Sequence, residues 1–223
     1  MSESKLITVD HTVYSSEYSI RKYLPELLKR CPILAFDVEC RSVYNKEERD
    51  EAKAYLKGST PADPYYRQAR VVAESSGLSY PTITKTTHFI FAESKEKVYT
   101  IICRTAEMEI LIWDLVVNYL GIYLVHNALF DLKICYERTG RLPVNYIDTS
   151  LMVKTMINHV DIWKAKVGLK ELVGEYYPPS WVMHNDYEPE DYKNPAFIKY
   201  CGYDGSGTFL LYELIQEELK GEE

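Results

Sequence analysis

The sequence has few cysteines, no long apolar run and no excess of positive charge. Its five cysteines are odd in number and form no Cys-x-x-Cys pair, which argues against a disulfide framework and a structural zinc site. No run approaches the roughly 18 apolar residues of a membrane span. The first ten residues also lack the pattern of a secretory signal. We therefore expect an intracellular protein, cytoplasmic or associated with the nucleoid, with no membrane partner.

The charge and the length limit the classes that remain. A net charge of −7 argues against a surface coated with phosphate-binding side chains. It leaves room for a small site that takes a nucleic-acid end, and for a metal site, which concentrates acids locally. The 223 residues, 46% of them apolar, fit one domain covering residues 1–223, with a substantial insertion.

Hydrophobic periodicity predicts an α/β domain with a mixed sheet covered by helices. The segment 41–85 is unusual because a solvated helix over 45–58 is followed by the loop-like residues 59–85, so we interpret 41–85 as an insertion. Elsewhere the patterns predict helices at 17–30, 106–120, 127–139, 146–158, 167–177 and 195–219, and strands at 32–40, within 87–103 and at 122–126.

Acidic side chains stand at the ends of several of these elements. Asp37 and Glu39 form an Asp-x-Glu on a predicted strand, so both carboxylates leave the sheet on one face. Asp131 lies four residues after Asn127, which we expect to cap its helix. Each pattern also has a structural explanation: a surface pair at a strand end for the first, and a capped first turn for the second. The apolar residues around Asp131 favour a compensating partner, because an unpaired buried carboxylate is costly.

The last helix carries Tyr200 and Asp204 on one face, four residues apart. Gly202, Gly205 and Gly207 stand beside them, although each glycine costs a helix up to about 1 kcal/mol relative to alanine. These glycines indicate close backbone packing or a kink beside a site, and a plain helix with weak positions is the alternative.

In chain order, the three patterns resemble the exonuclease motifs of the DEDD (DnaQ-like) superfamily. Tyr200 points to its DEDDy branch, because the histidine branch would have a histidine where this chain has Lys199. The segments YIDTSLM and VGLKELVGEYY, and Asp204 with Thr208, also make the chain similar to the proofreading exonuclease domain of family A DNA polymerases. The likeness spans roughly residues 33–214, with 41–85 unmatched.

The resemblance implies an RNase H-like (DnaQ-like) mixed central sheet flanked by helices, with the insertion after the first strand. It further implies metal-dependent 3′–5′ hydrolysis of DNA, from single-stranded or frayed 3′ ends, releasing nucleoside monophosphates. A proofreading role, with a DNA polymerase or other replication protein as partner, would follow. Tyr200 would orient the attacking water or help to deprotonate it. Two divalent ions, Mg²⁺ or Mn²⁺, would be held by four carboxylates: Asp37, Glu39, Asp131 and Asp204.

Substrate contacts are less sharply indicated. Cys40 stands where relatives often have a threonine or serine that contacts the terminal nucleotide, and Asn127 would position the helix or the substrate. His126 is expected to pack or support. In the insertion, Tyr65, Tyr66, Arg67 and Arg70 combine stacking and phosphate-binding groups, and a mobile surface loop is the equal alternative. Weaker candidates are Phe130, Trp163, Lys164 and Lys166.

Three other functions remain open. The first is an RNase D-like exonuclease, which would distinguish RNA by its 2′-hydroxyl groups. The second is a nuclease for short or signalling oligonucleotides, with the insertion as a lid. The third is a non-catalytic binding module, which we expect to have lost at least one of the four acids, and all four are present.

Overall fold

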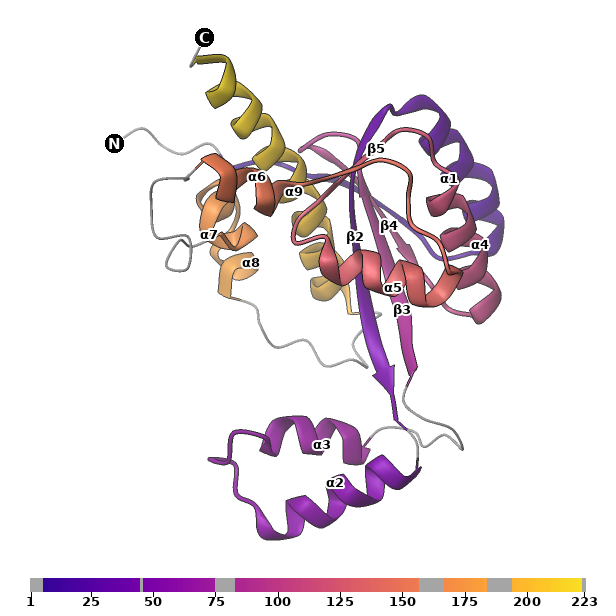
Figure 1. Ribbon diagram of the computed structural model, residues 1–223, viewed down its shortest axis with the longest axis vertical. Coiled ribbons are helices and arrows are strands. Elements are labelled where there is room, and N and C mark those ends of the chain that lie inside the picture. Colours follow the sequence, from indigo (N-terminus) through magenta and orange to yellow (C-terminus); the bar gives the residue numbers. More distant parts are fainter. Residues whose placement is uncertain (1–5, 45, 75–82, 157–166, 184–193, 222–223) are drawn as a thin grey trace. The chain divides into compact units, whose positions relative to one another are not determined.

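The chain divides into two compact units. The computed structural model describes residues 6–44, 46–74, 83–156, 167–183 and 194–221 (Figure 1). One unit consists of Met1–Glu39 with Thr86–Glu223, and the other is the intervening segment Cys40–Lys85. The acids that the sequence singles out all belong to the first unit.

A six-stranded mixed sheet forms the centre of the first unit. β1 pairs in parallel with β4, β4 is antiparallel to β3, and β2, β5 and β6 pair in parallel. The predicted mixed sheet is therefore confirmed. In spatial order the strands are β1 (Asp10–Tyr14), β4 (Lys97–Ile102), β3 (Ile83–Ala92), β2 (Ile33–Val43), β5 (Ile122–Val125) and β6 (Tyr146–Asp148).

Helices cover both faces of this sheet (Figure 1). One face packs against α4 (Ala106–Val117), with α1 (Glu17–Arg30) and α5 (Leu129–Thr139) beside it. The other lies under the long α9 (Pro195–Gly221), which α6 (Thr149–Met156), α7 (Leu169–Val173), the 3₁₀ turn Gly174–Tyr176 and α8 (Pro179–Met183) flank.

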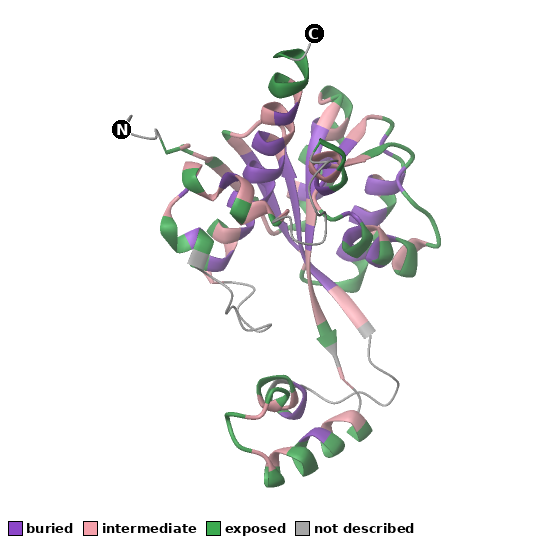
Figure 2. Ribbon diagram, turned by 60° about the vertical axis from the view of Figure 1, so that its left-hand side comes forward, coloured by how far each residue is buried: buried purple, intermediate pink, exposed green. Residues whose placement is uncertain are grey.

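Side-chain alternation along β2 decides where its acids point. Ala35 packs in the cluster that contains Phe197 and Cys201 of α9, whereas the ring of Phe36 meets Trp113 of α4. Successive side chains of a strand point to opposite faces. Asp37 and Glu39 therefore share the face of Ala35, toward α9. Figure 2 shows the buried residues of β2 and α9 in purple.

Two glycines bring α9 close to the sheet. A Cβ at Gly205 would lie 2.7 Å from the Cγ2 methyl of Ile90 in β3, and one at Gly202 would lie 2.8 Å from the imidazole of His11 in β1. Both distances are shorter than van der Waals contact, so any side chain there would push the helix outward. The close backbone packing that the glycines indicated is thus confirmed, and it sets the depth at which α9 presents Tyr200 and Asp204.

The second unit is a pair of helices, α2 (Lys46–Gly58) and α3 (Tyr66–Glu74). They pack through a small apolar contact made by Ala52, Leu56, Ala69, Val72 and Ala73. The prediction of α2 is confirmed. The loop predicted over 59–85 is wrong for Tyr66–Glu74, because the apolar spacing of α3 was hidden among tyrosine, arginine and proline residues, and it is wrong for 83–85, which begin β3. Residues 75–82 lie outside the described part of the chain.

Other boundaries also differ from the predictions. The polar start contains β1, an edge strand, so the strand that carries Asp37 is the second and not the first. The predicted helix 146–158 begins as β6, the helix 167–177 divides into α7 and a 3₁₀ turn, and α8 was not anticipated. Among the described residues, no helix has the length and apolar character needed to cross a membrane.

Candidate metal centre and active site

Three carboxylates converge between β2 and α9. Asp37, Glu39 and Asp204 each offer an oxygen, and these oxygens all lie within 4.8 Å of one another. The arrangement follows from the fold, since Asp37 and Glu39 leave β2 on the face that α9 covers. Asp204 is 8% exposed. Like charges this close repel one another unless a cation lies between them.

Asp131 reaches the same place from α5. Its Oδ1 accepts a hydrogen bond of 3.0 Å from the backbone N–H of Val38, the residue between the two acids of β2. The carboxyl group is 2% exposed, and its charge raises the pKa of both Asp37 and Glu39. The structure thus brings the four predicted acids together, with three of them in the tight oxygen cluster and Asp131 beside it.

Burial is the main cause of the altered acidity of this cluster. It raises the pKa of Asp37 well above the ordinary value, with further increases from Asp131, Glu39 and Asp204. Burial raises the pKa of Glu39 to about 8, reinforced by Asp204 and Asp131 and opposed by Lys170. It also raises the pKa of Asp131 and Asp204 to about 7. Without a metal ion, the cluster therefore holds protons at neutral pH.

Tyr200 lies over the cluster with its hydroxyl group fixed from one side. The ammonium Nζ of Lys170 in α7 donates to the Tyr200 hydroxyl at 3.1 Å and lies 4.3 Å from the centre of its ring. Burial, followed by the charges of Asp204, Glu39 and Asp37, raises the pKa of Tyr200 further above its usual value near 10. The phenol is therefore neutral, which favours orientation of a water molecule over its deprotonation.

Asp204 has a second fixed partner. The indole Nε1 of Trp181 in α8 donates to its Oδ1 at 3.0 Å, and Trp181 is only 1% exposed. After the dominant effect of burial, the pKa of Asp204 is lowered in part by Lys170, Trp181 and Tyr200. The carboxyl group is thus carried by α9 and also held by α8.

The turn before α5 differs from the prediction. Asn127 does not cap the helix: the N-cap is Ala128, with no side-chain cap hydrogen bond. Asn127 is exposed and takes a left-handed backbone, with φ of 63°, which asparagine tolerates better than most residues. Asp148 at the end of β6 accepts the N–H groups of Asn127 and Ala128 instead, at 3.1 and 2.9 Å. A substrate contact by Asn127 stays a prediction.

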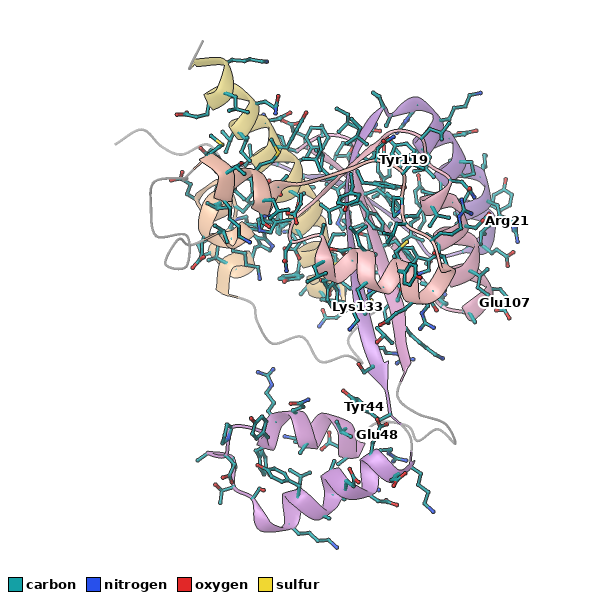
Figure 3. All side chains as sticks on the ribbon, viewed as in Figure 1. Arg21, Tyr44, Glu48, Glu107, Tyr119 and Lys133 are labelled. Atoms are coloured by element: carbon teal, nitrogen blue, oxygen red, sulfur yellow. The ribbon has the colours of Figure 1, made fainter. Side chains whose placement is uncertain are left out.

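His126 has a supporting place. Its Nε2 donates to the carbonyl oxygen of Val167 at 2.9 Å, and its Nδ1 lies 3.0 Å from Thr149 Oγ1. Burial lowers the pKa of this imidazole. The nearby Lys133 pairs instead with Glu137 at 3.8 Å on the surface of α5, where Figure 3 labels it. Lys170 of α7 is instead a cation close enough to the acids to oppose the effect of burial on the pKa of Glu39 and Asp204.

Most of the remaining substrate candidates with described positions belong to the second unit. Cys40 follows Glu39 in β2 and is partly buried, while Tyr65 precedes α3 with 65% of its surface exposed. Tyr66 and Arg67 begin α3, and Arg70 forms an ion pair of 2.8 Å with Glu74. Their contact with a substrate stays a prediction. Phe130 is half exposed at the start of α5. Three weaker candidates lie outside the described residues: Trp163, Lys164 and Lys166.

Three residues of the site were missed from the sequence. Lys170 lies in the segment VGLKELVGEYY, for which we predicted a helix. The lysine in that helix was the available signal. Asp148 begins the noted Asp-Thr pair, which signals a helix cap. Trp181 gave no usable signal, because a tryptophan is more often core than a ligand partner.

The donor set suits a hard divalent cation. The oxygens of Asp37, Glu39 and Asp204 are within reach of a single ion, and carboxylate oxygens are the ligands that Mg²⁺ and Mn²⁺ prefer. Burial is the largest cause of the raised pKa of each of these acids, so the cluster favours a ligand that offsets the cost of keeping buried carboxylates ionised. A bound cation would supply the positive charge that Lys170 alone does not provide.

Comparison with known proteins identifies the fold. No protein-family model matches the chain, and no curated protein matches it. Among solved structures, it is similar to NrnC of Brucella melitensis with bound Mg²⁺, with 11% identity, a TM-score of 0.55, and coverage of 97% of this chain and 84% of NrnC.

Two further structures are similar at comparable levels. The catalytic core of RRP6 from Trypanosoma brucei has 13% identity and a TM-score of 0.62, over 99% of this chain and 51% of that one. Escherichia coli RNase D, an exoribonuclease involved in structured RNA processing, has 14% identity and a TM-score of 0.54, over 96% and 45%. The likeness to polymerase proofreading domains finds no support in these structures. The chain therefore shares the RNase H-like fold of these structures, which is the fold that the resemblance of its three acidic motifs implied.

Proposed function

We propose that the protein is a metal-dependent 3′–5′ exonuclease that hydrolyses single-stranded nucleic acid. The observation that supports this most directly is the convergence of Asp37, Glu39 and Asp204 within 4.8 Å, with Asp131 hydrogen-bonded to the strand between the first two. A cluster of buried acids at this separation has no evident structural purpose, because its repulsion destabilises the metal-free fold.

The four acids would hold two divalent ions. When bound, such ions supply Lewis acidity that activates water and stabilises the charge that develops on a phosphodiester. Asp37 and Glu39 would present their oxygens from the rigid sheet, and Asp204 from a helix that glycines hold close to it.

Tyr200 and Lys170 would act on the water and the phosphate. The hydroxyl group of Tyr200 accepts from Lys170 and hydrogen-bonds to the Asp204 carboxyl group, lowering its pKa, so it links the lysine to one of the proposed metal ligands. Lys170 keeps the hydroxyl in this orientation and adds a positive charge on the side where an anionic substrate would approach. Hydrolysis at the last phosphodiester would release a nucleoside monophosphate.

The substrate class follows less directly. The sequence favoured DNA and proofreading. The similar structures favour RNA and short oligonucleotides, because RNase D is described as an exoribonuclease and NrnC has also been solved bound to pGG. We therefore propose RNA or a short oligonucleotide as the preferred substrate, and DNA becomes the alternative to be tested.

The decisive experiment is digestion of 5′-labelled single-stranded RNA and DNA of matched sequence, together with the dinucleotide pGG, in Mg²⁺, Mn²⁺ or EDTA. We expect a ladder that shortens from the 3′ end only when a divalent metal is present. A 3′-phosphate should slow the reaction, since the enzyme would need a free 3′ end. Comparison of the initial rates on RNA, DNA and pGG then establishes the substrate class.

Two variants make the result specific. Asp37→Asn should abolish the ladder, while Lys133→Ala should leave it unchanged, because Lys133 is a surface residue of α5 whose side chain is 69% exposed. The exonuclease proposal fails if the wild-type protein digests none of the three substrates, or if Asp37→Asn retains the wild-type rate.

A further inference from the structure

Asp148 makes an unusual number of backbone contacts for a residue outside the metal cluster. Its Oδ2 accepts from Ala128 N at 2.9 Å, and its Oδ1 accepts from Asn127 N at 3.1 Å. The same Oδ1 also accepts from Ser150 N at 2.9 Å and Leu151 N at 3.4 Å. One carboxylate therefore satisfies N–H groups at the starts of two helices, α5 and α6.

The contacts with Asn127 and Ala128 matter because the N-cap residue of α5 makes no side-chain hydrogen bond of its own. Its N-cap is Ala128, whose side chain cannot accept a hydrogen bond. The preceding Asn127 has a left-handed backbone, with φ of 63°, a conformation that costs free energy in a residue other than glycine. The carboxylate of Asp148 is thus the group that holds this strained turn closed.

The turn decides where Asp131 lies. Asp131 is in the first turn of α5, three residues after Ala128, so a rotation of the helix start moves its carboxyl group directly. Asp148 is itself fixed, because β6 pairs in parallel with β5 and Asp148 is opposite Val125. Thr149 adds a second link, since its Oγ1 lies 3.0 Å from His126 Nδ1 and 3.3 Å from the carbonyl oxygen of Val125.

We propose that Asp148 is a positioning residue for the metal centre: it fixes the strained turn at Asn127 and thereby sets the place of Asp131. This inference rests on the proposed function, because it names a residue that acts through one of the proposed ligands. Outer residues that orient metal ligands typically change metal affinity or activity by roughly 10- to 100-fold when mutated.

The negative charge of Asp148 is unfavourable in the metal-free protein, so we attribute its role to its hydrogen bonds and the geometry that they fix. Its negative charge raises the pKa of Asp131, so it adds to the repulsion in an already acidic region. The four N–H donors give it a structural reason to be there in spite of that repulsion. A role through geometry and a role through charge make different predictions for two variants of this residue.

Asp148→Asn and Asp148→Ala remove the same charge but different contacts. Asparagine with its oxygen at the Oδ1 position keeps the acceptor for Asn127, Ser150 and Leu151, and loses only the contact with Ala128. Alanine loses all four. Thr105→Ala is the matched control, because Thr105 caps α4 by accepting from Met108 N at 3.2 Å on a helix that carries none of the four acids.

The experiment measures Mn²⁺ affinity by calorimetry and hydrogen exchange of the Val38 amide in the metal-free protein, beside kcat and KM on the best substrate. We expect Asp148→Ala to weaken Mn²⁺ binding and lower kcat by roughly 10- to 100-fold, with faster exchange at Val38. Asp148→Asn should lie clearly closer to the wild type. Thr105→Ala should lose comparable stability and leave Mn²⁺ affinity, kcat and Val38 exchange unchanged.

Three outcomes overturn the inference. Equal losses of Mn²⁺ affinity in the two Asp148 variants would show an effect of charge and not of position. Unchanged affinity and Val38 exchange in Asp148→Ala would show a purely structural cap. A loss in Thr105→Ala as large as that in Asp148→Ala would show that any weakened helix start has this effect. If the wild-type protein has no nuclease activity, the proposed function fails, while the binding and exchange measurements still decide the role of Asp148.

Discussion

Asp204→Asn should make the metal-free protein more stable and the metal-bound protein inactive. The variant removes one negative charge from the buried cluster and keeps an oxygen that can accept from Trp181. In the wild-type protein, burial raises the pKa of Asp204 to about 7, against an ordinary value of 3.8. Above pH 7 the folded protein must therefore keep an ionised carboxylate where ionisation is unfavourable.

The size of the effect follows from that difference in pKa. One pKa unit corresponds to about 1.4 kcal/mol, so the shift of Asp204 corresponds to at most roughly 4 kcal/mol at pH 8. In a protein of this size, each 1 kcal/mol moves Tm by roughly 2–4 °C. We therefore expect Tm of Asp204→Asn in EDTA at pH 8 to rise by several degrees, and by about 15 °C at most. At pH 5 the difference should be smaller, because Asp204 is then protonated in the folded protein and is ionised only in the unfolded chain.

The assay is thermal unfolding of the wild type, Asp204→Asn and Asp204→Ala at pH 5 and pH 8, with EDTA or with Mg²⁺. Alanine also removes the acceptor of Trp181, and a buried donor without a partner costs about 1–3 kcal/mol. Asp204→Ala should therefore gain less stability than Asp204→Asn. With Mg²⁺, the wild type should gain stability through ligand binding, and both variants should gain much less.

Two results would refute this reasoning. One is an Asp204→Asn protein that is no more stable than the wild type in EDTA at pH 8, which would mean that the cluster is not under electrostatic strain. The other is an equal rise of Tm with Mg²⁺ in wild type and variant, which would place the metal elsewhere.

Four further outcomes are expected. The acids have raised pKa values in the folded state, so the folded protein binds more protons than the unfolded chain. The stability of the metal-free protein, measured by urea unfolding, should therefore fall as pH rises from about 4 to about 8. Gly205→Ala would place a Cβ 2.7 Å from Ile90, so it should lose about 1–3 kcal/mol of stability and much of the activity. Unfolding and kcat measure the two losses, and unchanged values would contradict the tight fit of α9. Lys170→Met should lower kcat more than it raises KM, as steady-state kinetics would show, because it removes the group that orients the Tyr200 hydroxyl. Arg67→Ala should raise KM for a long oligonucleotide and not for pGG, whereas Lys57→Ala on α2 should change neither; equal effects on both substrates would argue against a strand contact by α3.

Local sequence patterns were sufficient for much of the fold, whereas the four acids were grouped as a site by the family resemblance, and their role stays a prediction. The two-residue period of a strand predicted that Asp37 and Glu39 share a face of β2. The alternation of side chains between the two faces of β2 confirms this. Gly202 and Gly205 in a helix of strong formers indicated close packing, which the structure shows against His11 and Ile90. These inferences succeeded because each depends on spacing within a single element.

The partners of the acids could not be found in the same way. Lys170 meets Tyr200, Trp181 meets Asp204, and Asp148 meets the turn at Asn127 only after several elements have packed. The cap of α5 was assigned to Asn127 because local rules favour it, and the tertiary contact with Asp148 prevailed. β1 was missed for a similar reason, since an edge strand buries one side and its five residues read as polar.

The acids come from β2, from α5 and from the C-terminal helix α9, so the centre joins parts of the chain that are far apart in sequence. A metal ion held by all of them would act as a non-covalent cross-link between the first third of the protein and its last helix. Opening of α9 would then require loss of the ion. Proteases that cut transiently opened segments act on the open form, so a smaller population of that form means slower cleavage. The ion of the proposed nuclease site would in this way also protect the protein from degradation, and chelation would shorten the lifetime of the protein.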